Sequence, residues 1–154
     1  MLFRSIIEPF LTQAVDKKAA TIVSDMIEAR GDIGTATTVP IVYSERFASD
    51  RQAGVAFMVA YMRGVRDYID ALEKNKNREQ IFGILAQATR FPVELVARMH
   101  LPYLDPNQRV SARAFEEVQK YYVAKGWVKK PVEIASLVDP SFAEEAVKRL
   151  GEYR

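Results

Sequence analysis

The stretch IIEPFLTQAVDKKAATIV (residues 6–23) decides how the fold of this chain is interpreted. It opens with Ile6 and Ile7, which are typical of the end of a buried strand. Pro9 then suits the first turn of a helix, and apolar residues follow it at helical spacing. After two lysines, residues 20–23 again favour a short strand. Strand, helix and strand in this order predict an α/β fold.

The rest of the chain is predicted to be mostly helical. Residues 24–34 favour a loop, and the β-branched segment 35–43 contains Pro40, which is typical of an edge strand or a crossover. A long helix then carries apolar residues from Val55 to Leu72 on one face. Sequence signals mark seven helix boundaries: a capping box of Ser49 and Gln52, further helix starts at Asn77, Pro92, Ser111 and Asp139-Pro140, and helix ends at Gly126 and Gly151.

Composition excludes several classes of site. The 154 residues carry a net charge of +2, which is too small for a nucleic-acid footprint. The chain has no Cys and one His, which excludes disulfides and thiolate zinc sites and leaves a metal site without support. No apolar run approaches the ~18–20 residues that a membrane span needs. We therefore expect an ordinary globular chain with no metal and no cofactor.

Five stretches resemble one family. They are IEPFLTQA (residues 7–14), YSxxFA (43–48), FMVAYMRGVRDY (57–68), QKYYVAKGWVKKPV (119–132) and LVDPSFA (137–143). Together they are similar to the substrate-binding proteins of ABC importers. Within that family, the nitrate/taurine/sulfonate and thiamine-precursor binding proteins are the most similar branch.

The resemblance implies a fold and a function. The fold is α/β, the C-terminal part of a two-lobe periplasmic binding protein type II fold, mostly helical after a short α/β segment. Residues 1–34 would end the second lobe, residues 35–44 would cross between lobes, and residues 45–154 would be the helical part of the first lobe. The chain would be a fragment of a periplasmic or extracytoplasmic solute-binding protein, monomeric when complete, that delivers a small solute to a membrane permease.

Four residues are candidates for contacts with that solute. Glu8 follows an expected strand, and ligands of open α/β sheets bind beyond the carboxyl ends of strands. The alternative is that Glu8 caps the helix that follows it. Thr37 and Thr38 could bind an oxyanion from the crossover, although strand propensity alone also explains them. Tyr43 could stack on a ring, although an aromatic residue there is also typical of a core.

Other conspicuous side chains have structural interpretations. Arg63 and Arg66 stand four residues before Asp67 and Asp70, and this spacing predicts ion pairs along one helix. No residue is predicted to be catalytic.

Two other classes of function are also compatible with the sequence. One branch of the family makes a thiamine pyrimidine with a histidine and a cofactor, but the only histidine here, His100, lies in the helical part. The other alternative is a small helical interaction module that binds no solute.

Overall fold

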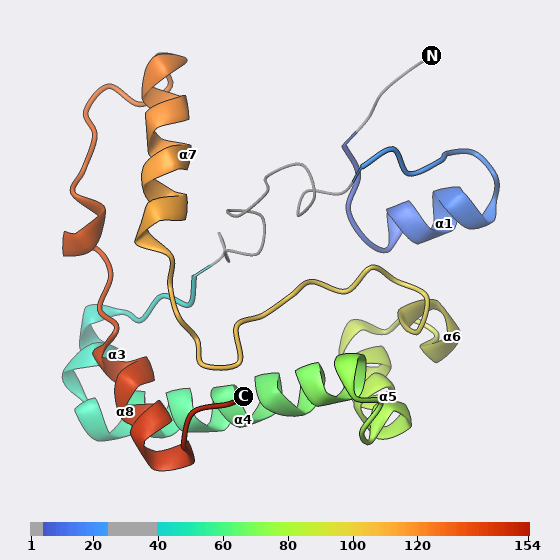
Figure 1. Cartoon of the computed structure of the whole chain (residues 1–154), viewed down its shortest axis with the longest axis horizontal. Helices are drawn as coiled ribbons and strands as arrows, with labels where there is room; N and C mark the ends of the chain where they lie inside the picture. Colours follow the sequence, from blue (N-terminus) through green and yellow to red (C-terminus); the bar gives the residue numbers. More distant parts are fainter. Residues whose placement is uncertain (1–4, 25–39) are drawn as a thin grey trace. The chain divides into compact units, whose positions relative to one another are not determined.

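The computed structural model describes residues 5–24 and 40–154, and every regular element within these ranges is helical (Figure 1). In chain order they are α1 (Phe10–Asp16), α3 (Glu45–Ser49), α4 (Arg51–Glu73), α5 (Arg78–Thr89), α6 (Val93–Val96), α7 (Ala112–Ala124), the 3₁₀ turn η2 (Ile134–Ser136) and α8 (Ser141–Leu150). The chain divides into two compact units. Of the described residues, the first unit holds 5–24 and 67–103, and the second holds 40–66 and 104–154.

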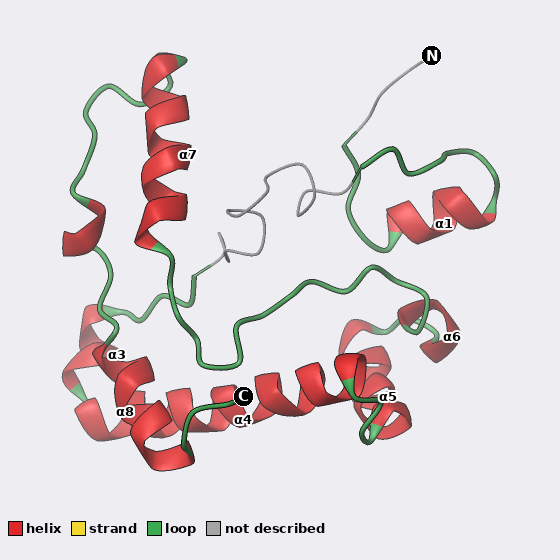
Figure 2. Cartoon of the chain, in the orientation of Figure 1, coloured by secondary structure: helices red, strands yellow, loops and turns green. Residues whose placement is uncertain are grey.

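The predicted α/β fold is wrong for the part of the chain that the structure describes. Figure 2 shows no strand there, and both expected strands are irregular. Ile7 and Val23, from the first and second of them, are 74% and 70% exposed. Strand propensity expresses how well a side chain fits a half-buried sheet. A segment with high strand propensity therefore forms no strand unless a neighbouring strand pairs with it. The described residues therefore do not form the α/β part that the two-lobe fold requires.

The expected crossover falls partly outside the described residues. Residues 35–39 are not described, and residues 40–44 are irregular until α3 begins. No separate helix start was predicted at Ser44, which directly precedes α3. The Ser44 hydroxyl caps it by accepting a hydrogen bond from the Phe47 amide at 3.2 Å.

The helices expected after residue 45 are confirmed, and their predicted starts and ends lie at Asn77, Pro92, Ser111, Gly126, Pro140 and Gly151. The Ser111 hydroxyl caps α7 by accepting a hydrogen bond from the Ala114 amide at 3.2 Å. After α7, Gly126 adopts a φ of +73°, and the amides of Gly126 and Trp127 donate to the carbonyls of Val123 and Tyr122. This pair of bonds is a Schellman motif, which needs a left-handed residue at the position of Gly126.

The predicted capping box before α4 is wrong. The Asp50 carboxylate, not Ser49, accepts a hydrogen bond from the Ala53 amide at 3.0 Å. Ser49 belongs to the end of α3, where its hydroxyl donates to the Arg46 carbonyl at 2.8 Å. Aspartate and serine are equally good residues at a helix N-cap. Because Ser49 belongs to α3, Asp50 is the residue that caps α4.

The core of the second unit lies between α4 and α8. Its buried residues are Val55, Met58 and Met62 from α4, and Phe142 and Ala146 from α8. The close approach of the two helices needs a glycine at position 54, since a Cβ there would lie 2.5 Å from Cε1 of Phe142. The Arg51 guanidinium also lies against this ring, 4.1 Å from its centre.

The first unit has buried apolar residues on three of its helices. Ile69, Phe82 and Val96, from α4, α5 and α6, are each at most 3% exposed. The Tyr68 hydroxyl donates a hydrogen bond to the Pro102 carbonyl at 2.5 Å, and burial raises the pKa of Tyr68 to about 12. In the same unit, Arg98 and Asp16 form an ion pair at 2.8 Å between α1 and the segment after α6.

Candidate functional site

Glu8, predicted to contact a ligand, lies just before α1 and already accepts three hydrogen bonds. Its Oε1 accepts from the Thr12 hydroxyl at 3.0 Å and from the His100 amide at 2.9 Å, and its Oε2 accepts from the Thr12 amide at 3.2 Å. Thr12 is 5% exposed, so the interaction is partly shielded from water. These bonds give Glu8 the capping role and also tie α1 to His100. Contact with a ligand remains a prediction.

Tyr43, the second candidate in the described residues, is part of the core of the second unit. Its hydroxyl donates to the Gly54 carbonyl at 2.9 Å, and its ring meets those of Phe47 and Phe142 edge-on at centroid distances of 5.0 and 4.9 Å. Burial raises the pKa of Tyr43. Glu8 and Tyr43 belong to different units. Thr37 and Thr38 lie outside the described residues.

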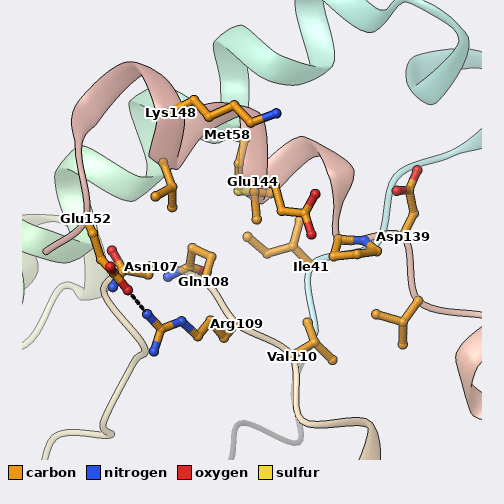
Figure 3. A pocket seen from close by; sticks show the side chains of 14 residues that line it. Ile41, Met58, Asn107, Gln108, Arg109, Val110, Asp139, Glu144, Lys148 and Glu152 are labelled. Atoms are coloured by element: carbon orange, nitrogen blue, oxygen red, sulfur yellow. Dashed lines mark hydrogen bonds and ion pairs between the residues drawn. The ribbon is translucent and has the colours of Figure 1, made fainter.

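A hollow of about 640 Å³ lies in the second unit beside α8 (Figure 3). Its apolar walls come from segments far apart in the sequence: Ile41 before α3, Met58 on α4, Val110 before α7, Val138 after η2 and Val147 on α8. Pockets for small ligands are about 300–1,000 Å³ in volume and mostly apolar, with a few polar groups that fix the ligand's orientation. The hollow is of this kind.

Charged groups of both signs surround the hollow. Arg109 and Glu152 point toward one another and form an ion pair on one side of it (Figure 3). Glu144 and Lys148 belong to α8 and line it as well. Asp139 lines it ahead of α8, and hydrogen bonds from Ser141 lower the pKa of Asp139, with a smaller contribution from the charge of Arg51.

A partly buried polar network fixes one wall of the hollow. Arg66, on α4, donates hydrogen bonds to the Pro106 carbonyl (3.1 Å), the Asn107 side-chain oxygen (2.9 Å) and the Gly151 carbonyl (2.7 Å). Asn107 is 6% exposed and exchanges hydrogen bonds with the Tyr153 backbone at 3.2 and 2.9 Å. The network therefore holds the segment before α7 and the segment after α8 against α4.

Arg66 also has partners that the sequence did not predict. The predicted partner, Asp70, forms ion pairs with Lys74 and Lys76 at 3.0 and 3.1 Å. Arg66 reaches partners 40 or more residues away, which a helical spacing rule cannot detect. The sequence also missed Arg109, Asp139 and Glu144 as lining residues, because no motif links them.

Within residues 5–24 and 40–154, no group of three or more His, Asp or Glu side chains is placed to hold a metal ion. In the same ranges, no helix has both the length and the apolar character needed to cross a bilayer.

Comparison with known proteins gives no relative from which a site could be transferred. The chain matches no protein-family model, no curated protein and no solved structure. The candidate site therefore rests on the geometry of the hollow and on the chemistry of its walls.

Proposed function

We propose that this chain is part of the solute-binding component of an ABC-type importer, which captures a small molecule without changing it and delivers it to a permease. The observation that carries the binding function is the hollow of about 640 Å³ beside α8. The importer context is supported by the five sequence stretches that resemble the nitrate/taurine/sulfonate and thiamine-precursor binding proteins. A permease partner and a periplasmic location are parts of the same proposal.

The walls of the hollow favour a small solute with both apolar and charged parts. Ile41, Val110 and Val138 offer apolar contacts. Glu144 and Lys148 offer an anion and a cation from the same helix, one turn apart. A zwitterion such as taurine could satisfy both charges at once. The proposal uses helices only and assigns no sheet to the described residues.

The proposal is tested by thermal unfolding of the 154-residue chain with nitrate, taurine, short alkanesulfonates and an aminopyrimidine. A ligand that binds only the folded state at 100 times its Kd stabilises it by about 2.7 kcal/mol. Val110→Trp, which places a large ring in the hollow, should abolish the stabilisation. Lys148→Gln should weaken it, whereas Lys17→Gln, an exposed lysine of the other unit, should not.

Three outcomes would contradict the proposal. Equal stabilisation of the wild type and Val110→Trp would place the solute elsewhere. Conversion of a solute into a product would indicate an enzyme. Insensitivity to every solute would favour the helical interaction module, which the exposure of large apolar side chains such as Leu137 (67%) also supports.

A further inference from the structure

The end of α7 carries three aromatic rings that contact one another and remain exposed to solvent. Tyr121, Tyr122 and Trp127 are 53%, 41% and 68% exposed. The Trp127 ring centre lies 6.0 Å from that of Tyr121 and 5.6 Å from that of Tyr122. We call these residues, together with Lys125, Lys129 and Lys130, the Trp127 patch.

Backbone and side-chain hydrogen bonds hold the patch in place. The Schellman motif at Gly126 turns the chain back, and the Trp127 amide donates to the Tyr122 carbonyl at 2.9 Å. Further on, the Gln119 side chain donates to the Val132 carbonyl at 2.9 Å and accepts from the Val132 amide at 2.8 Å. These hydrogen bonds therefore hold the segment between Trp127 and Val132 against α7, and with it the backbone of Lys129 and Lys130.

The patch is positively charged. Between residues 119 and 132 the sequence has four lysines and no acidic residue. Lys120 is paired with Glu117 at 2.7 Å, whereas no ion pair between described residues uses Lys125, Lys129 or Lys130. All three of these lysines are exposed. A partner of this surface should therefore carry negative charge.

The combination of side chains favours a lipid surface over a nucleic acid. Tryptophan and tyrosine have apolar rings with one polar group and prefer the boundary between headgroups and acyl chains. Lysines beside them attract anionic headgroups while their methylene stems lie along apolar surface. Nucleic acids instead need rings whose faces are free for bases. Here the Tyr121 and Trp127 rings meet at 81°, edge to face.

We propose that the Trp127 patch binds the surface of a membrane that contains anionic lipid, with Trp127 inserted among the headgroups and the lysines bound to lipid phosphates. The interaction is peripheral, and it does not depend on the proposed solute binding. The structure supports it through the fixed aromatic cluster and the three lysines without an acidic partner among the described residues.

The chain contains its own reporter, because Trp127 is its only tryptophan. The experiment adds vesicles of phosphatidylglycerol and phosphatidylcholine, or of phosphatidylcholine alone, to the full chain and records tryptophan emission and co-sedimentation. We expect a shift of the emission to shorter wavelength and co-sedimentation with the anionic vesicles only. Both signals should decrease as salt is added, because salt screens exposed charges.

Two matched variants test the lysines. Lys129→Gln with Lys130→Gln should weaken partitioning roughly 30-fold, since one lysine near an anionic surface contributes on the order of fivefold. Lys17→Gln with Lys18→Gln removes the same charge from another adjacent pair of exposed lysines and should have no effect. Trp127→Ala should reduce co-sedimentation. Far-UV circular dichroism should show the same helix content in all variants.

Four results would overturn the proposal. They are unchanged emission of Trp127 with anionic vesicles, equal binding to phosphatidylcholine alone, equal effects of the two double-lysine variants, and a response of Trp127 to a single-stranded oligonucleotide instead of to vesicles. The last result would identify the patch as a nucleic-acid site.

Discussion

Gly54→Ala is the sharpest test of the way α8 packs on α4. A Cβ at position 54 would lie 2.5 Å from Cε1 and 3.1 Å from Cδ1 of Phe142, and 3.4 Å from Cε2 of Tyr43. The Phe142 ring is 7% exposed and is held between Tyr43 and the Arg51 guanidinium. The ring therefore has little room to move away, and the added methyl group must push the two helices apart.

The size of the effect follows from two opposing contributions. Replacing glycine by alanine inside a helix stabilises it by about 1 kcal/mol. An extra methyl group in a well-packed core costs about 1–3 kcal/mol. Gly64→Ala separates these contributions, because position 64 is on the same helix and a Cβ there meets no atom within 4 Å. We expect Gly64→Ala to be more stable than the wild type, and Gly54→Ala to be less stable than Gly64→Ala by about 1–3 kcal/mol.

The assay is urea unfolding of both variants, followed by far-UV circular dichroism. The helix-propensity contribution cancels in the comparison, so the difference between the two unfolding free energies measures the contact with Phe142. If the two variants are stabilised equally, Phe142 does not pack against α4 at Gly54, and the core described for the second unit is incorrect.

Three more substitutions test single interactions. Asn107→Ala should lower the unfolding free energy by about 1–3 kcal/mol, because it removes the hydrogen bonds of the buried Asn107 side chain with Arg66 and with the Tyr153 backbone; urea unfolding measures this. Because its pKa is lowered in the folded state, ionised Asp139 stabilises the fold at pH values above the ordinary carboxyl pKa, and this stabilisation is lost as the pH falls through the lowered pKa. Asp139→Asn should therefore flatten the acid limb of a plot of melting temperature against pH. Because the pKa of Tyr68 is raised to about 12, its contribution to the free energy of unfolding is complete below about pH 10 and is lost as the pH rises through about 12. Tyr68→Phe should therefore remove one late step from an absorbance titration of tyrosinate.

The helices could be predicted from the sequence because their signals are local. Ser111 and Gly126 act on backbone groups within a few residues, so a short window contains the whole interaction. The strands could not be predicted in the same way. Ile7 and Val23 have the composition of a strand, but a strand also needs a neighbour far away in the sequence to pair with it.

The candidate site was harder to predict because its residues meet only through tertiary packing. The helical spacing predicted only a local ion pair for Arg66, whereas its hydrogen bonds to Pro106 and Gly151 reach 40 and 85 residues further along the chain. Gly54 and Gly64 are both glycines within one helix, yet only Gly54 faces a ring. No pattern in a single sequence distinguishes such positions.

The two proposed binding surfaces can be separated experimentally because they share no residue. The hollow beside α8 is lined by Val110 and Lys148, among others, and the Trp127 patch is built on α7 and the turn that follows it. Substitutions at sites without shared partners usually have independent effects. Val110→Trp should therefore abolish stabilisation by a solute and leave vesicle binding intact, and the Lys129/Lys130 double variant should do the reverse. If either variant abolished both activities, a general loss of structure would explain the result better than two separate sites.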